Sequence, residues 1–218
     1  MLTYDDIRKN DEINTYIKKA DESLFALGYT EHSFAHVTKV ALNAAYILET
    51  LGYGERDIEL VKIAAHLHDI GNLINRIEHA QSGAILAFRL LDKLGFPPEE
   101  IATVATAIGN HDEGTAVPVN HICAALILAD KSDVRRTRVR ENIAGFDIHD
   151  RVNYSVTSSS LEFDKEKNSF ILDMTIENEY CSVMDYFEIF LERMLLCRKA
   201  AEKLGVGFRL IINGQRLV

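Results

Sequence analysis

The sequence has few of the features that mark secreted, redox-active or membrane-spanning proteins. It has only three cysteines, Cys123, Cys181 and Cys197, and no two of them have the spacing of a metal-binding or redox motif. Each lies in an apolar stretch, so we expect buried free thiols in a reducing compartment. The longest apolar run, HICAALILAD, is too short to span a bilayer. Because the charged start MLTYDDIRKN does not resemble a signal peptide, we expect a cytoplasmic protein without a membrane partner.

Basic residues are also in deficit. Lys and Arg number 24 against 33 for Asp and Glu, which gives a formal net charge of -9. An acidic surface disfavours non-specific binding of nucleic acid, so a nucleic-acid partner is not expected. A phosphate substrate remains compatible with this charge, because bound divalent metals would change the local sign. The sequence has no Gly-rich phosphate-binding loop.

The chain of 218 residues, 47% of them hydrophobic, suits one moderate domain with a sizeable core, or a domain with a small appendage. Apolar periodicity and Gly or Pro boundaries predict helices in the first two thirds. These helices are expected over 3–27, 33–51, 56–70, 79–94, 98–108 and 118–133.

The pattern changes near residue 150. Alternation predicts a hairpin of strands over 152–163 and 169–178, followed by a helix over 181–204 and a last strand over 207–213. We therefore predict a mostly α fold in which residues 1–148 form a helical metal-binding domain and residues 149–218 form a small C-terminal α+β (ββαβ) extension.

Histidines and aspartates recur at the ends and within successive predicted helices. The candidate metal ligands are His36, His68, Asp69, His79, His111 and Asp130. Ligands scattered over several helices and directed to one core are typical of metal sites in helical bundles. A carboxylate beside an imidazole, as in the His68-Asp69 pair, can bridge two metal ions. Two ions can activate a water molecule, which makes hydrolysis the first reaction to consider.

The other histidines fit this site less well. His66 lies about 200° around its helix from His68, and His121 lies on the side of its helix opposite Asp130, at about 100° per residue. His32 precedes His36 by one turn. It could line the mouth of a pocket, or it could simply begin a helix.

These motifs together resemble the HD superfamily of metal-dependent phosphohydrolases over roughly residues 30–140. The resemblance rests on HLHDIG, EHAQSG, NHDEG and LADKSD. It implies an HD-domain helical bundle in which His36, His68, Asp69 and Asp130 bind one metal ion. Asp69 would bridge to a second ion held by His79 and His111. Nitrogen and carboxylate ligands without thiolate suit two divalent ions of Fe, Mn, Zn, Ni or Co.

Charged residues after Asp130 are candidates for catalysis and phosphate binding. Asp133 shares the helix face of Asp130 and could orient a ligand or the attacking water, or be a plain acid at a helix end. Lys131, Arg135 and Arg136 could contact a substrate phosphate, or form a solvated, ion-paired face. We therefore predict Asp69, Asp133 and Lys131 as catalytic residues. Arg135, Arg136 and His32 are predicted to contact the phosphate.

The resemblance implies a metal-dependent phosphohydrolase that acts on a small phosphate mono- or diester such as a nucleotide. Two alternatives remain open. The same six ligands would serve a di-iron oxygenase, and an HD domain can also be a regulatory or binding module without turnover. Exposed strand edges in the C-terminal region could pair two copies into a homodimer.

Overall fold

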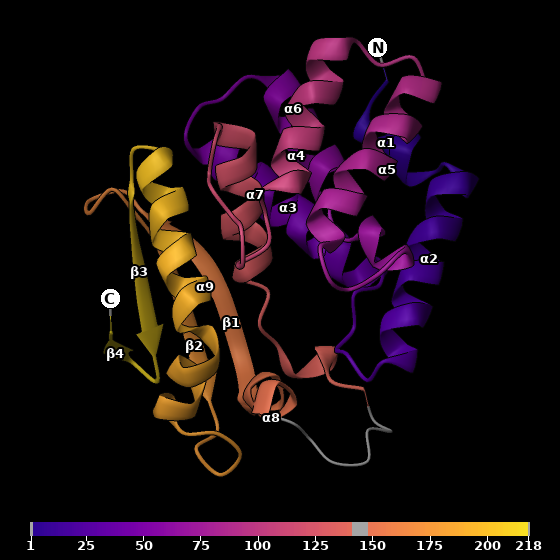
Figure 1. The fold of residues 1–218 in the computed structure, drawn as a ribbon. Helices are drawn as coiled ribbons and strands as arrows, with labels where there is room; N and C mark the ends of the chain where they lie inside the picture. The colour runs from indigo at the N-terminus through magenta and orange to yellow at the C-terminus, as the bar shows by residue number, and fades with distance from the viewer. Residues whose placement is uncertain (1, 141–147, 218) are drawn as a thin grey trace.

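The computed structural model describes residues 2–140 and 148–217. A helical bundle comes first, and a four-stranded sheet covered by one long helix follows it (Figure 1). The elements are α1 (Tyr4–Arg8), α2 (Asp11–Ala26), α3 (Phe34–Thr50), α4 (Glu55–Leu67), η1 (Ile70–Leu73), α5 (His79–Lys93), α6 (Pro98–Gly109), α7 (His121–Lys131), η2 (Arg136–Arg138), α8 (Ile148–Ser155), β1 (Val156–Asp164), β2 (Ser169–Ile176), α9 (Val183–Lys203), β3 (Gly207–Ile212) and β4 (Gln215–Arg216). The mostly α fold with a small C-terminal sheet is confirmed. Among the described residues, none of the helices combines the length and apolarity needed to span a membrane.

Helix α7 lies at the centre of the bundle because its sequence is apolar on nearly every side. All its residues from Ile122 to Lys131 are buried, as expected for a helix surrounded by protein. Helices α3, α4 and α6 pack on it, and α9 packs on it from the C-terminal part. Asn120 caps the first turn by accepting a hydrogen bond from the Cys123 N–H at 2.8 Å. Asp130, near the end of this helix, is therefore fixed in the protein interior.

Helices η1 and α5 pack backbone against backbone. A Cβ atom added to Gly71 would lie 2.5 Å from the Gly83 N, and one added to Gly83 would lie 3.2 Å from the His68 O. Real Cβ atoms essentially never come within 3.0 Å of such neighbours. The two glycines thus allow the segment that carries Asp69 to lie directly against the start of α5, where His79 is located.

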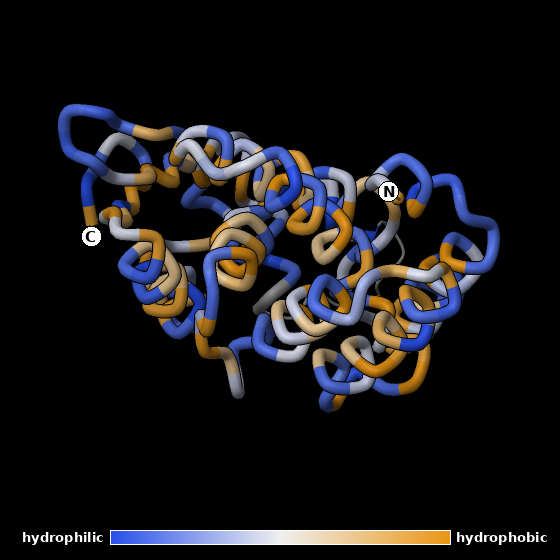
Figure 2. Tube along the Cα trace, turned by 90° about the horizontal axis from the view of Figure 1, so that it is seen from above, coloured by the Kyte–Doolittle hydropathy of each residue, from blue (hydrophilic) through white to orange (hydrophobic). Residues whose placement is uncertain are grey.

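The sheet has the order β1-β2-β3-β4, with β1 and β2 antiparallel, β2 and β3 parallel, and β3 and β4 antiparallel. A parallel neighbour requires a crossover connection, which α9 provides. Helix α9 covers one face of the sheet (Figure 1). The Tyr46 hydroxyl on α3 accepts a hydrogen bond from the Phe163 N–H at 3.1 Å, so the sheet also contacts the bundle. Hydrophilic stretches form most of the outer turns of the molecule (Figure 2).

Some predicted boundaries were wrong. The helix expected over 3–27 is broken before α2, because the Asn10 side chain caps α2 by accepting the Ile13 N–H at 3.1 Å. Residues 152–155 belong to helix α8 rather than to a strand. Val152 and Ser155 are both buried and lie three residues apart, which is the spacing of one helix face. The local alternation of apolar and polar residues fits a strand equally well, so the sequence did not distinguish the two.

The other expected boundaries shift by smaller amounts. The expected 118–133 helix begins at His121, and the 56–70 helix ends at Leu67 before the 3-10 turn of η1. The short strand β4 was not predicted. The proposed domain boundary at 148/149 adjoins residues 141–147, which lie outside the described residues, and it stays a prediction.

Candidate metal centre

The structure brings all six predicted metal ligands to one buried place. They come from α3, the two residues after α4, the start of α5, the second residue after α6, and α7. The set is His36, His68, Asp69, His79, His111 and Asp130, each of which is at most 8% exposed. Residues separated by up to 94 positions in sequence thus share one site.

One half of the site is formed by His36, His68 and Asp130. Their Nε2, Nε2 and Oδ1 atoms lie within 4.8 Å of one another. The Asp130 Oδ1 is 3.3 Å from the Nε2 of His36 and 3.6 Å from the Nε2 of His68. Asp69 joins this half, because its Oδ2 lies 3.1 Å from the His68 Nε2. Two imidazole nitrogens and two carboxylate oxygens at such spacing can surround one cation.

The other half is reached through the second oxygen of Asp69. Its Oδ1 lies 3.4 Å from the His79 Nε2 and 4.0 Å from the His111 Nε2. His68, Asp69 and His111 also form a group whose ligand atoms lie within 4.8 Å of one another. The Asp69 carboxylate therefore faces both halves, as a bridging ligand would.

The histidine rings are oriented by hydrogen bonds at their other nitrogen. Three of them place Nδ1 next to a backbone carbonyl oxygen three residues earlier. The distances are 2.7 Å from His68 to Ala65, 3.1 Å from His79 to Arg76 and 2.6 Å from His111 to Ile108. A carbonyl oxygen only accepts, so each Nδ1 carries the proton. In the neutral ring, Nε2 then has a free lone pair directed at the centre.

His36 has the same arrangement with a carboxylate. Its Nδ1 lies 2.8 Å from the Oδ2 of Asp133, which is fully buried. The Nε2 atoms of His36 and His68 face each other at 3.3 Å. The Asp69 Oδ2 is buried without a hydrogen-bond partner among the described residues. Imidazole nitrogens and buried carboxylate oxygens that converge in this way are stabilised by a cation between them, either a proton on a ring or a metal ion. The residues present therefore fit a divalent metal ion.

The electrostatics also favour positive charge at this centre. Burial lowers the pKa of His68, but the carboxylates of Asp69 and Asp130 outweigh it and raise that pKa to about 10. Burial raises the pKa of Asp69 and Asp130, yet cationic neighbours, led by His68 and Lys131 respectively, hold both well below their usual value. Burial and the charge of His68 lower the pKa of His111 to about 3, so its ring is neutral and able to bind a metal.

Behind Asp130, a chain of charged groups leads to helix α9. The Lys131 Nζ lies 2.7 Å from the Asp130 Oδ2 and 3.2 Å from the Glu113 Oε2. The Glu113 Oε1 in turn accepts a hydrogen bond from the Arg193 Nε at 2.8 Å. Lys131 thus orients Asp130.

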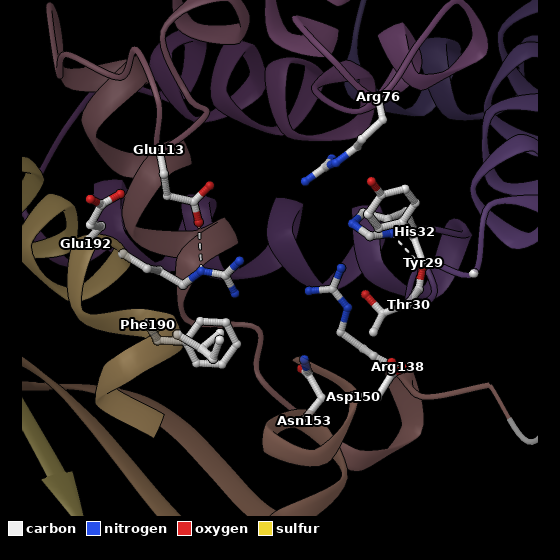
Figure 3. Close-up of a pocket in the computed structure, with 13 residues that line it drawn as sticks. Tyr29, Thr30, His32, Arg76, Glu113, Arg138, Asp150, Asn153, Phe190 and Glu192 are labelled. Carbon is white, nitrogen blue, oxygen red and sulfur yellow. Dashed lines mark hydrogen bonds and ion pairs between the residues drawn. The ribbon is translucent and has the colours of Figure 1, made fainter. Parts of the chain in front are cut away.

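A cavity of about 440 Å³ lies near the metal centre. Its wall includes His32, Arg76, Glu113, Arg138, Phe190 and Arg193. Figure 3 shows Arg76 and Arg138 directed into the same open space from opposite sides. The Arg76 Nη1 lies 3.4 Å from the His79 Nε2, and the His32 ring is 5.5 Å from the His36 ring. Arg76 and His32 thus connect the cavity wall with the centre, while the six ligands themselves are not among the described lining residues.

Two of the predicted phosphate contacts lie elsewhere. Arg135 and Arg136 line a separate cavity of about 330 Å³, together with Lys39 and hydroxyl residues of β1. The Arg135 Nε donates to the Asp133 Oδ1 at 3.0 Å, and the Arg136 Nη2 lies 2.6 Å from the Glu177 Oε2. The structure does not bring these two residues to the metal centre, and their contact with a substrate phosphate stays a prediction. His32 does line the main cavity.

Three arginines of the main cavity were not predicted from the sequence. Arg138 belongs to the basic run after α7, and Arg76 precedes His79 by three residues, so both had a weak local signal. Arg193 lies on α9, far along the chain from every ligand, and nothing in its own segment indicates the site. His121 is placed away from the centre, where its ring stacks on Tyr53 at 4.7 Å.

The chain is similar to known proteins. The model of the HD domain family matches residues 33–189. An uncharacterised protein of Methanocaldococcus jannaschii is 32% identical over 39% of this chain, and the matched part also spans 39% of that relative. The crystal structure of a predicted HD superfamily hydrolase from an uncultured Thermotogales bacterium matches with 28% sequence identity and a TM-score of 0.44. The match covers 57% of this chain and 67% of that protein's chain.

Proposed function

This chain belongs to the HD domain family, and from that premise we propose that it is a metal-dependent phosphohydrolase. Its substrate would be a small phosphate mono- or diester such as a nucleotide. The observation that carries the proposal is the buried centre itself, where four Nε2 atoms and the carboxylates of Asp69 and Asp130 converge. Two divalent ions would be held there. Fe, Mn, Zn, Ni or Co would suit the site, because its ligands are nitrogen and carboxylate oxygen without thiolate.

Bound divalent ions would supply Lewis acidity and a water of lowered pKa at neutral pH. The residues of the chain would do the rest. Asp69 would hold both ions through its two oxygens, while Asp133 and Lys131 fix His36 and Asp130 in position. Arg76 lies close enough to the centre to bind the oxygens of the phosphate that reacts there.

Two alternatives stand beside this proposal. A di-iron oxygenase would use the same six ligands; the three arginines of the cavity wall favour an anionic substrate for either reaction, and Glu113, Asp150 and Glu192 lie in the same wall. Oxygen consumption and a mixed-valent di-iron signal in electron paramagnetic resonance would favour the oxygenase. A module without turnover would have no need to retain all six ligands. Homodimerisation through the C-terminal sheet remains a proposal that gel filtration would test.

The test begins with elemental analysis of the purified protein, followed by a screen of phosphate esters and nucleotides with each metal. Asp69→Ala should lose both the metal and the turnover, because it removes the carboxylate that faces both halves of the site. Asp57→Ala is the matched control, since Asp57 lies in the first turn of α4, the helix that precedes Asp69, and pairs with His121 at 3.2 Å, away from the centre. A fully active Asp69→Ala variant would refute the mechanism.

A further inference from the structure

The main cavity holds two arginines beyond the one beside the metal centre. Arg138 comes from η2 and is 5% exposed, and Arg193 comes from α9. Both line the cavity. Burial lowers the pKa of Arg138, the carboxylates of Asp133 and Asp130 partly offset this, and the nearby charge of Arg193 lowers it. Two guanidinium groups that share a poorly solvated space repel each other, and an anion between them would relieve that repulsion.

Each of the two guanidinium groups is held from behind. Arg138 donates through Nε to the Glu31 O at 3.1 Å and through Nη1 to the Asp133 O at 3.0 Å. Arg193 donates through Nε to the Glu113 Oε1 at 2.8 Å, and its guanidinium packs over the Phe190 ring at 4.3 Å. Within the described part of the chain, Arg193 donates hydrogen bonds through Nε alone. The remaining Nη atoms are thus preorganised donors at the cavity wall.

Arg76 occupies a different position. Its Nη1 is 3.4 Å from the His79 Nε2, at the metal centre itself. The pair formed by Arg138 and Arg193 still interacts with the centre, since the charge of Asp130 contributes to the pKa of both. The cavity therefore offers one anion position at the metal centre beside Arg76 and a second beside Arg138 and Arg193.

We propose that the substrate carries at least two anionic phosphoryl groups, one at the metal centre and the other bound between Arg138 and Arg193. This inference rests on the proposed function only for the position of the reacting group. It also assigns a role to the C-terminal region: α9 supplies half of the second anion site. A phosphate monoester with a single anionic group would leave that half of the cavity unused.

The test compares two probes that cannot be hydrolysed, methylphosphonate and methylenediphosphonate, by isothermal titration of the full-length, metal-loaded protein. The wild type should bind the diphosphonate on the order of tenfold more tightly or better. Arg193→Gln should lose most of this preference and keep its affinity for methylphosphonate. Arg193→Lys, which retains a cation beside Glu113, should lose part of it. Arg198→Gln is the matched control, because Arg198 lies on the same helix and is 51% exposed.

Elemental analysis after each titration shows whether the metal has stayed in place. Equal affinities of the wild type for the two probes would overturn the proposal. So would a preference that survives in both Arg193 variants, because metal chelation alone would then explain it. Failure of the phosphohydrolase proposal looks different: no phosphate ester would be turned over, while the preference for two anionic groups would remain intact.

Discussion

Replacement of Gly71 by alanine is expected to destabilise the protein strongly and to disturb the metal centre. The added Cβ would lie 2.5 Å from the Gly83 N and 2.7 Å from the Ser82 Oγ, and still closer to the His79 O. Two of these three neighbours are backbone atoms, so no side chain can rotate to relieve the contact. Helices η1 and α5 would have to separate. Overpacking of this kind costs about 3 kcal/mol, which for a chain of this size lowers the Tm by roughly 6–12 °C.

The same separation would pull His79 away from Asp69, whose Oδ1 now lies 3.4 Å from the His79 Nε2. We therefore expect metal affinity to fall on the order of tenfold in Gly71→Ala. Urea unfolding in the presence of a chelator measures the stability without the contribution of bound metal. A chelator-competition titration then measures the affinity.

Gly109→Ala is the matched control, and its expected change in stability has the opposite sign. A Cβ at Gly109 would meet only the Ala84 Cβ, at the ordinary distance of 3.5 Å. Gly109 is the last residue of α6, where alanine is favoured by up to about 1 kcal/mol. The reasoning would be refuted if Gly71→Ala unfolded at the wild-type urea concentration, or if the two variants lost equal stability.

Two further predictions concern supporting residues. Asp133→Asn should weaken metal binding by about 10- to 100-fold while the fold is kept, because Asp133 orients the His36 ring at 2.8 Å; an unchanged affinity in the chelator titration would contradict this. Glu100→Gln tests a pH dependence, since the Arg56 Nε donates to the Glu100 Oε1 at 2.7 Å and this ion pair holds the pKa of Glu100 below its usual value of 4.5. Above about pH 4.5 the ion pair should contribute about 1 kcal/mol to the unfolding free energy. This contribution should be lost as the pH falls through the lowered pKa of Glu100. The difference in unfolding free energy between wild type and variant should therefore shrink below about pH 4.5, and a constant difference from pH 7 to about pH 3 would exclude the linkage.

Local signals in the sequence were sufficient for most helices and for a set of candidate ligands that the fold brings together. Periodic apolar residues, the stop at Gly95 and the Pro98 start predicted α5 and α6 closely. Alternation predicted the β1–β2 hairpin, although it extended the first strand over residues of α8. These elements could be predicted because caps, glycines and side-chain periodicity act within a few residues.

The candidate site was predictable in part for a related reason. Its six ligands combine residue types that bind metals with positions on successive helices, and the resemblance to the HD superfamily ordered them into two halves. The structure shows what the pattern could not: the three Nδ1–carbonyl bonds and the Asp133–His36 contact that aim the Nε2 atoms at one centre. Such second contacts depend on ring orientation, which has no signature in the spacing of residues.

The sequence by itself determined that metal-binding side chains would lie on several helices of an acidic chain, because composition and periodicity are local properties. Only the tertiary structure decided which cations line the cavity beside them. Arg76, Arg138 and Arg193 come from three distant segments, and the contacts of α9 with α7, of η1 with α5 and of η2 with α8 bring them together. Contacts between such distant segments depend on how whole faces fit, and no short stretch of sequence encodes that fit.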